Sequence, residues 1–303
     1  MVSKRKGNNI NGWIIIDKPA GITSTGVVSK IKWAFNAKKV GHAGTLDPDA
    51  TGVLPIALGE ATKTIPYIMD EIKSYHFCIK LGEATDTDDA SGRIINTSSK
   101  RPSDNKVSIL LKKYTGFIEQ TPPNYSAIKV NGVRAYDLAR SGTQIELKSR
   151  SLFVKELKFL KRIDDDHVLL QLTCGKGGYV RSIARDLGKD LKCFAHVKWL
   201  RRIWAGPFEI ENSITLKKIE DLEKLSSLMK LLQPLEVGLQ NLPFITCSKN
   251  DVVHIANGRS ITVSAKKIAA DEKCWIECNG KALALGTVRD SQFYPSRVLN
   301  IEN

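Results

Sequence analysis

The sequence lacks the segments that would carry a chain into or across a membrane. It contains no long uncharged apolar run and no lipidation signal. Residues 1–9 are basic and polar, without the apolar stretch of a secretory signal. We therefore expect no membrane association and a cytoplasmic location.

The sequence also lacks the spacings typical of a bound metal or nucleotide. Its six cysteines are scattered, with no CxxC pair and no His/Cys cluster of zinc spacing. The glycine-rich run at 175–178 does not match the GxxxxGKS/T pattern of a phosphate-binding loop. We therefore expect reduced thiols, no metal and no cofactor. The cysteines are Cys78, Cys174, Cys193, Cys247, Cys274 and Cys278.

Acidic residues are too few to balance the basic ones. The chain has 46 Lys+Arg against 32 Asp+Glu, a formal net charge of +14 and a pI near 9.4. Such an excess favours a polyanionic partner, because neutralising phosphates releases counterions and drives association. An anionic membrane would satisfy the same charge, but nothing in the sequence anchors the chain there. Nucleic acid is the favoured partner.

Hydrophobic patterning predicts an α+β protein with a large and a small domain. The 303 residues can bury a sizeable core. Strands are predicted near 13–16, 53–58, 74–81, 152–160 and 168–174, and helices near 107–114, 135–140, 179–191 and 214–232. A further helix is expected to begin with Ser24 near its N-cap.

Beyond Pro243 the pattern changes to short strands and turns. Strands are predicted at 252–255, 260–263, 274–277 and 282–286. We divide the chain into a basic tail at 1–9, a catalytic domain at 10–242 and a small β module at 243–303. One chain looks complete as a monomer.

The most informative residue is Asp47, a carboxylate on a glycine-rich loop. Pro48 biases Asp47 toward an extended backbone, and Gly44 and Gly52 allow sharp turns and close approach of a ligand. A carboxylate presented beside a buried strand suits a nucleophile or a general base. By local spacing alone, capping a turn is the commoner role for such an aspartate.

Four motifs together resemble the tRNA pseudouridine synthase B family. The run GHAGTLDPDATGVLPIALGEATK, which ends at Lys63, resembles the family's catalytic segment. DKPAGITS at 17–24 is similar to its opening motif, and TPPNYSAIK at 121–129 to a central one. GGYVRS at 177–182 resembles the segment that carries the family's arginine, although Gly178 stands where threonine is more usual.

The resemblance implies a pseudouridine-synthase fold, a mixed and largely antiparallel sheet flanked by helices, followed by a PUA-like RNA-binding module. It implies isomerisation of uridine 55 in the T-loop of tRNA by base flipping, with no cofactor. Asp47 corresponds to the catalytic nucleophile, which could attack the base or capture the sugar as a glycosyl ester.

Two further catalytic residues follow from the resemblance. Arg181 corresponds to the arginine expected to keep the nucleophile ionised and oriented. The position of Arg181 in the sequence would equally suit a surface arginine that binds an RNA phosphate. Tyr75 corresponds to the active-site tyrosine, although its register with Phe77 and Ile79 is that of a core residue.

Substrate contacts are also expected. His42 resembles the family histidine that engages the T-loop. Without the resemblance, a lone histidine is ordinarily a loop residue whose hydrogen bonds are made within the protein. Asp89 matches a substrate-contacting position and could equally be an Asx-turn residue. Lys18 and Lys63 would bind phosphates or close ion pairs. The substrate-binding set predicted from the sequence is His42, Asp89, Tyr179, Leu200, Lys18 and Lys63.

Three other functions compete with this one. Residues 47–51 fit the DxDxT pattern of haloacid-dehalogenase phosphatases, but a hydrophobic strand should precede that motif and does not. A non-catalytic RNA-binding protein would share the basic charge and the β module. A guide-RNA-dependent relative that modifies ribosomal RNA is disfavoured by the absence of long basic extensions.

Overall fold

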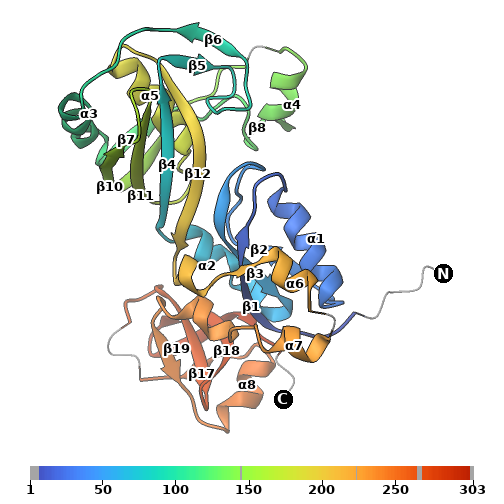
Figure 1. Ribbon diagram of the computed structural model, residues 1–303. Helices are drawn as coiled ribbons and strands as arrows, with labels where there is room; N and C mark the ends of the chain where they lie inside the picture. Colours follow the sequence, from blue (N-terminus) through green and yellow to red (C-terminus); the bar gives the residue numbers. More distant parts are fainter. Residues whose placement is uncertain (1–6, 144, 223, 265–267, 301–303) are drawn as a thin grey trace. The chain divides into compact units, whose positions relative to one another are not determined.

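The computed structural model describes residues 7–143, 145–222, 224–264 and 268–300, and they divide into two compact units (Figure 1). The first unit comprises residues 1–48, 53–69 and 206–303, and the second comprises 49–52 and 70–205. The predicted basic tail lies largely outside the described residues. Among those described, no helix is long and apolar enough to span a membrane.

The first unit begins with a buried strand, β1 (Gly12–Lys18), whose Trp13, Ile14 and Ile16 are fully buried. Its other elements before the C-terminal module are α1 (Ser24–Ala34), β2 (Val40–His42), β3 (Thr51–Leu58), η1 (Gly59–Lys63), α2 (Ile65–Asp70), β13 (Phe208–Glu209), η3 (Ile210–Asn212), β14 (Ile214–Thr215), α6 (Leu216–Glu220), α7 (Leu225–Met229) and η4 (Leu235–Leu239). β1 lies between β14 and β3, and β2 pairs antiparallel with β3. The helical segments predicted near 214–232 correspond to two short helices, α6 and α7.

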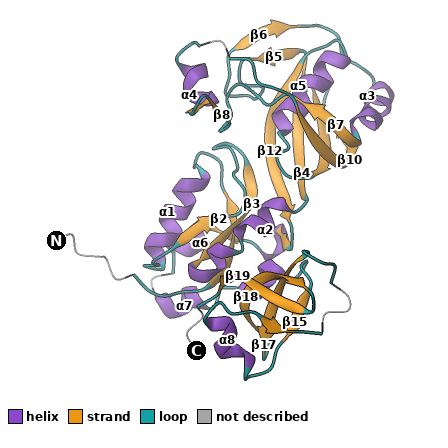
Figure 2. Ribbon diagram, turned by 180° about the vertical axis from the view of Figure 1, so that it is seen from behind, coloured by secondary structure: helices purple, strands orange, loops and turns teal. Residues whose placement is uncertain are grey.

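The second unit is built on five strands in the order β12-β4-β11-β10-β7, each pair antiparallel (Figures 1 and 2). Its elements are β4 (Lys73–Leu81), β5 (Glu83–Thr85), β6 (Ile94–Thr97), α3 (Asp104–Leu111), η2 (Lys112–Tyr114), β7 (Gly116–Gln120), β8 (Lys129–Val130), β9 (Val133–Arg134), α4 (Ala135–Arg140), β10 (Arg150–Arg162), β11 (His167–Cys174), α5 (Val180–Asp190) and β12 (Ala195–Ala205). The strands predicted at 152–160 and 168–174 and the helices at 107–114, 135–140 and 179–191 are confirmed. The α+β class and the largely antiparallel sheet are confirmed as well.

β4 is more deeply buried than its alternating sequence predicts. Phe77 and Ile79 are inside as expected, but Ser74 and Cys78 on the opposite face are also buried. β4 is buried in this way because it is a central strand of the sheet, between β12 and β11. Tyr75 therefore sits in the middle of the sheet, with 8% of its surface exposed.

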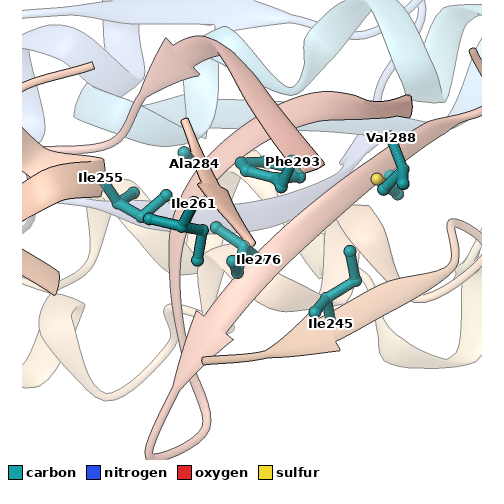
Figure 3. Packing of buried hydrophobic residues seen from close by; sticks show 8 residues of the cluster. Ile245, Ile255, Ile261, Ile276, Ala284, Val288 and Phe293 are labelled. Atoms are coloured by element: carbon teal, nitrogen blue, oxygen red, sulfur yellow. The ribbon is translucent and has the colours of Figure 1, made fainter. Parts of the chain in front are cut away.

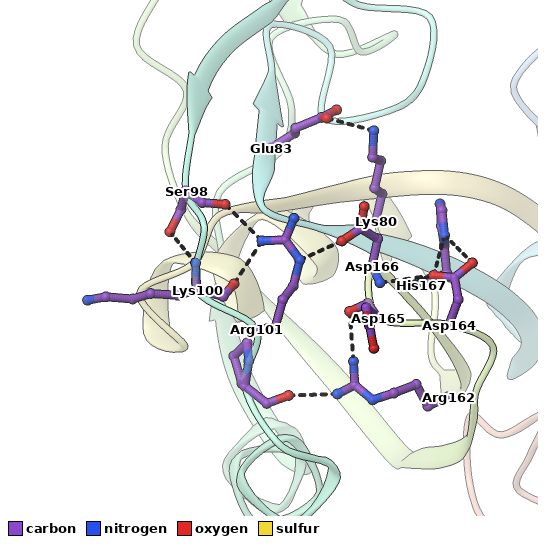
Figure 4. A network of polar contacts seen from close by, with 11 residues as sticks. Lys80, Glu83, Ser98, Lys100, Arg101, Arg162, Asp164, Asp165, Asp166 and His167 are labelled. Carbon is purple, nitrogen blue, oxygen red and sulfur yellow. Dashed lines mark hydrogen bonds and ion pairs between the residues drawn. The ribbon is translucent and has the colours of Figure 1, made fainter.

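The turn between β10 and β11 is fixed by a polar network (Figure 4). Arg101 donates to Asp166, and Arg162 donates to Asp104 and to the carbonyl of Asp165. Asp164 accepts from the backbone of His167 and contacts its ring. The carboxylates of Asp164 and Asp166 and the backbone carbonyl of Asp165 therefore all stabilise the turn.

The C-terminal module is a five-stranded sheet in the order β15-β17-β18-β19-β16. Its elements are β15 (Phe244–Thr246), α8 (Asp251–Ala256), β16 (Ile261–Thr262), β17 (Lys273–Cys278), β18 (Lys281–Arg289) and β19 (Gln292–Val298). Ile255, Ile276, Ala284 and Phe293 are fully buried in its core (Figure 3). β15 and β19 were not predicted from the sequence.

The strand predicted at 252–255 is wrong, because these residues form most of α8. Ser248 donates from its backbone and its hydroxyl to the carboxylate of Asp251, which fixes the turn leading into the helix. Only Ile255 of the helix is fully buried. The hydrogen-bonded turn at 248–251 therefore outweighs the β preference of the adjacent Val252 and Val253.

Candidate active site

The Asp47 loop is held immediately before the aspartate by Ser24. The Ser24 hydroxyl accepts from the amide of Leu46 at 2.9 Å and donates to the carbonyl of the same residue at 3.0 Å. The helix cap expected from Ser24 is instead provided by Thr23, whose hydroxyl accepts from the amide of Gly26. Ser24 is therefore the first residue of α1 and an anchor for the loop.

The loop is held immediately after the aspartate by the carbonyl of Pro48. This carbonyl accepts from the amide of Gly21 at 3.0 Å and from the Lys18 ammonium at 2.7 Å. Both residues flanking Asp47 are thus bonded to the opening motif at 17–24. Asp47 itself is half-buried.

Lys18 has no exposed surface. Its ammonium donates to the carbonyls of Pro19, Ile22 and Pro48 at 2.7–2.8 Å. An ammonium has three hydrogens to donate, and three backbone carbonyls accept from it here. This burial argues against the predicted contact with an RNA phosphate and makes Lys18 an anchor of the Asp47 loop.

The downstream end of the loop belongs to the second unit, where it pairs with β12. Thr51 pairs with Arg201 and Gly52 with Arg202, in parallel register. The Thr51 hydroxyl donates to the carbonyl of Leu200 at 3.3 Å. A Cβ on Gly52 would lie 2.1 Å from the carbonyl oxygen of Arg202, and Gly52 has φ +98°, so glycine is required there.

Tyr75 lies directly opposite Arg202 on the neighbouring strand β12. Arg202 is 1% exposed, and its guanidinium is hydrogen-bonded to the Tyr75 side chain. Burial lowers the pKa of Arg202, and the Tyr75 oxygen opposes this effect. Because a guanidinium only donates, the phenol oxygen is the acceptor.

A second buried cation lies near Arg202. Lys73 is 6% exposed and donates to the carbonyl of Glu71 at 2.7 Å. Burial, with the positive charge of Arg202, lowers the pKa of Lys73 to about 8. Tyr75 thus lies on a strand whose N-terminal end holds positive charge away from water.

Arg181 is the first-turn residue of α5 that the sequence singled out, and its side chain is 7% exposed. Its guanidinium donates to the carbonyls of Thr87 at 3.2 Å and Tyr125 at 3.0 Å. It lies 3.7 Å from Oδ2 of Asp89. The structure therefore brings together two residues that were predicted from separate motifs, Asp89 and Arg181.

Asp89 also stabilises a turn, which was the other interpretation of this residue from the sequence. Its Oδ1 accepts from the Thr87 hydroxyl and from the amide and hydroxyl of Ser91. One carboxylate oxygen thus fixes the turn while the other faces Arg181. The two interpretations of Asp89 are compatible.

Tyr179 precedes α5 and is fixed by the side chain of Gln120. The Gln120 amide accepts from the backbone N–H of Tyr179 at 2.8 Å and donates to its carbonyl at 3.1 Å. Ser182 donates to the carbonyl of Thr121 at 2.8 Å. The central motif at 121–129 and the arginine segment are therefore joined by hydrogen bonds.

Sequence reasoning missed an ion pair beside this cluster. Arg185, one turn after Arg181, contacts Asp88 at 3.0 Å and Asp186 at 2.8 Å. Burial raises the pKa of Asp88, and Arg185 opposes this effect. The i, i+4 spacing of the two arginines on a helix was the available signal.

His42 and Lys63 lie in the first unit. His42 is half-buried on β2, paired with Ile56 of β3. The Lys63 ammonium donates to Glu60 and to the carbonyl of Val298, both at 2.7 Å. Of the two roles considered for Lys63, the structure shows the ion pair.

The predicted site residues are thus positioned in each unit by named contacts. The first unit holds His42, Lys18, Lys63 and Asp47, and the second holds Tyr75, Asp89, Tyr179, Arg181 and Leu200. The pairing of Arg181 with Asp47 stays a prediction. Gln120 and Arg185 are supporting residues that the sequence did not single out. Ser24 was expected only near the helix cap, and Arg202 only as positive charge that could follow an RNA backbone, a role that its 1% exposure argues against.

Comparison with known proteins identifies relatives over nearly the whole chain. Residues 32–180 match the model of the TruB family pseudouridylate synthase N-terminal domain. Residues 181–240 match the tRNA pseudouridylate synthase B C-terminal domain. The chain is 53% identical over 300 residues to tRNA pseudouridine synthase B of Ruegeria sp. (strain TM1040), covering 99% of each chain. It is 52% identical over 298 residues to the protein of the same name from Ruegeria pomeroyi, covering 98% of each.

Solved structures show the same fold. A chain from a Cbf5-Nop10-Gar1 complex is 26% identical, with a TM-score of 0.72 and coverage of 96% of this chain and 84% of that one. A chain from an H/ACA RNP bound to a substrate RNA containing 2′-deoxyuridine is 25% identical, with a TM-score of 0.73 and coverage of 96% and 85%.

Proposed function

The chain belongs to the TruB family of pseudouridylate synthases, and from this premise we propose how its own residues carry out the reaction. It is a pseudouridine synthase that acts on tRNA. The substrate position that we propose is uridine 55, presented by the T-stem-loop. Its curated relatives carry the name tRNA pseudouridine synthase B.

The isomerisation breaks the bond between N1 of uracil and C1′ of ribose and forms a bond from C5 to C1′. The proton on C5 is lost and N1 gains one, so the product has the composition of the substrate. Asp47 is the proposed nucleophile, by attack on the base or by capture of C1′ as a glycosyl ester. The target base must leave the RNA stack to reach it.

The other proposed roles lie in the second unit. Arg181, oriented by Asp89 and by the carbonyls of Thr87 and Tyr125, supplies fixed positive charge for a carboxylate nucleophile. Tyr75 offers a ring surface and a hydroxyl whose oxygen already accepts from Arg202. Tyr179, Leu200 and His42 are proposed to contact the substrate.

One observation chiefly supports Asp47 as the reacting group. The residues on both sides of it are bonded through their backbone groups to Ser24, Gly21 and Lys18, so the loop has little freedom. A reacting carboxylate needs such a fixed backbone, because catalytic geometry tolerates errors of only about 0.5 Å.

Asp47→Asn tests this role, with Asp49→Asn as its matched control. Asp47→Asn keeps the size of the side chain and removes the nucleophilic charge, so pseudouridine formation on unmodified tRNA should fall below detection while tRNA binding persists. Asp49 is also an aspartate, is exposed and lies only two residues away. Asp49→Asn should retain activity, as measured by chemical mapping of pseudouridine.

Equal loss of activity in both variants would contradict the assignment of the nucleophile. A chelator should leave activity on a minimal T-stem-loop unchanged. Hydrolysis of a phosphate ester that depends on Mg²⁺ would instead support the phosphatase alternative. Modification at a uridine other than position 55 would correct the proposed substrate position.

A further inference from the structure

The C-terminal end of α1 carries a tryptophan that is almost wholly exposed. Trp33 is 86% exposed, more than any other large hydrophobic side chain among the described residues. The buried face of the helix is formed by Ser24, Val27 and Ile31. At 100° per residue, Trp33 lies about 180° from Ser24 around the helix axis, so it points directly away from that face.

The surface around Trp33 is basic. Lys32, Lys38 and Lys39 are exposed, and none forms an ion pair with another described residue. Lys30 is the exception, since it pairs with Glu220 of α6 at 2.5 Å. From residue 18 to residue 46 the sequence contains five lysines and no acidic residue. We call Lys32, Trp33, Lys38 and Lys39 the α1 surface.

The start of the described chain is attached to the same place. The Asn8 amide donates to the carbonyl of Asn36 at 2.6 Å, and its carbonyl accepts from the amide of Lys38 at 3.1 Å. Its side chain donates to the carbonyl of Phe35. The turn that presents Lys38 and Lys39 is therefore fixed by backbone bonds on two sides.

This chemistry fits RNA. An exposed indole beside unpaired lysines offers a stacking surface together with phosphate-binding charges, which is the combination that single-stranded nucleic acid binders use. We propose that the α1 surface contacts tRNA, with Trp33 stacking on a base or ribose and the lysines on phosphates. This proposal rests on the tRNA substrate of the proposed function, and it adds a contact that the Asp47 chemistry does not need.

The placement within the first unit is compatible with such a contact. Ser24, at the start of α1, is bonded to Leu46 beside the nucleophile. Nine residues of helix separate Ser24 from Trp33, a rise of about 14 Å at 1.5 Å per residue. This distance is smaller than the width of an RNA duplex.

The test is tRNA binding by full-length protein carrying Trp33→Ala, measured against Phe117→Ala. Phe117 is also a highly exposed aromatic residue, 79% exposed, but it belongs to the second unit. Trp33→Ala should weaken binding of intact tRNA about 5- to 150-fold, the range for loss of one stacked base. Phe117→Ala should leave the affinity unchanged, and kcat at saturating tRNA should be unchanged in both.

The lysines are tested by the salt dependence of binding. Lys38→Gln with Lys39→Gln should reduce the slope of log K against log salt by about 0.7 to 0.9 for each phosphate that the variant no longer neutralises. The double variant Lys155→Gln with Lys161→Gln removes the same charge from exposed positions on β10 and should leave the slope nearly unchanged.

Unchanged tRNA affinity in Trp33→Ala together with an unchanged slope in the lysine variant would overturn the proposal. Loss of binding to vesicles of phosphatidylserine and phosphatidylcholine, with tRNA affinity unchanged, would overturn it in favour of a membrane contact. A failure of the proposed function would be distinguishable from a failure of the α1 surface proposal, because in that case the wild-type protein itself would form no pseudouridine in tRNA.

Discussion

At the scale of the residue, the buried Arg202 determines which hydrogen bonds the hydroxyl of Tyr75 can form. A guanidinium that is 1% exposed is costly unless its hydrogens are accepted, and the Tyr75 oxygen accepts from it. The phenol hydrogen is then directed away from Arg202. Tyr75 is therefore arranged to donate its hydroxyl hydrogen to a group other than Arg202. We infer that Arg202 is a positioning residue for Tyr75.

A double-mutant cycle of Arg202→Met and Tyr75→Phe tests this relation. Arg202→Met keeps an unbranched side chain of similar length, and we expect it to lower kcat about 100-fold, the lower end of the contribution of a positioned proton donor. In a Tyr75→Phe background the same change should lower kcat little further, because the hydroxyl through which it acts is gone. Additive losses, or equal losses in tRNA affinity, would indicate general disruption of β12.

Lys73 makes the free energy of unfolding depend on pH. Its pKa falls from 10.5 in the unfolded chain to about 8 in the fold, so between these values the unfolded state binds more protons. Stability should therefore rise as pH increases from 8 to 10.5. At neutral pH, burial of the charged Lys73 ammonium lowers the free energy of unfolding by about 3 kcal/mol. Its hydrogen bond to the carbonyl of Glu71 offsets about 1 kcal/mol of this loss.

Lys73→Met should accordingly raise the free energy of unfolding at pH 7 by about 1–2 kcal/mol, and the gain should vanish above pH 10.5. Urea denaturation at pH 7 and at alkaline pH measures the difference. Lys155→Met, on the exposed side of β10, should show no such trend. A stability gain that is independent of pH would assign the effect to packing.

At the scale of the element, the start of α1 divides two tasks between adjacent hydroxyls. Thr23 caps the helix through Gly26, and Ser24 holds both backbone groups of Leu46. The sequence indicates that a cap lies here, since both residues are good caps. It does not indicate which hydroxyl turns inward, because that depends on the position of the Asp47 loop in the fold.

Thr23→Ala and Ser24→Ala should therefore differ. Thr23→Ala should cost about 0.5–2 kcal/mol of stability and leave kcat unchanged, because it removes only a cap. Ser24→Ala leaves a buried N–H and carbonyl of Leu46 without their partner, costing about 1–3 kcal/mol, and should also lower kcat by loosening the loop. Thermal unfolding and single-turnover kinetics separate the two. Equal kcat in both variants would mean that Ser24 does not position Asp47.

Elements were predicted well where periodicity is strong and poorly where capping or sheet position decides. α4 begins and ends at the predicted residues, 135 and 140. β4 follows its predicted bounds to within one residue, but its second buried face depends on strands far away in the sequence. The helix at 251–256 depends on Asp251, whose carboxylate fixes the preceding turn and outweighs two β-branched residues.

At the scale of the whole molecule, motifs named the proposed site residues but not the roles of the residues that support them. Asp47, Arg181 and Asp89 were identified from the resemblance, and Arg181 and Asp89 were found in contact. The supporting roles of Arg202 and Ser24 were missed, because the sequence indicated only a basic surface residue and a residue near a helix cap. Their roles arise from long-range pairing with β4 and with the Asp47 loop.

Within the first unit, the C-terminal module is joined to the other elements by specific contacts. Lys63 donates to the carbonyl of Val298, the amide of Asn300 donates to Glu60, and the amide of Ala282 donates to Glu236. Lys273 lies over the ring of Tyr67. The boundary at residue 242 and RNA binding by the module stay predictions. These contacts indicate that removing residues 243–303 would do more than remove a surface for RNA.

We expect the C-terminal module and the rest of the first unit to unfold together. Lys63→Met breaks an ion pair and a bond to the module while retaining the aliphatic stem, and should destabilise both by about 1–3 kcal/mol. Hydrogen exchange should then show equal loss of protection in β1 and in β18, because one cooperative unit opens as a whole. Lys217→Met, at an exposed position on α6, is the control. Loss of protection confined to β18 would instead make the module an independent domain, and its deletion would then be a clean test of RNA binding.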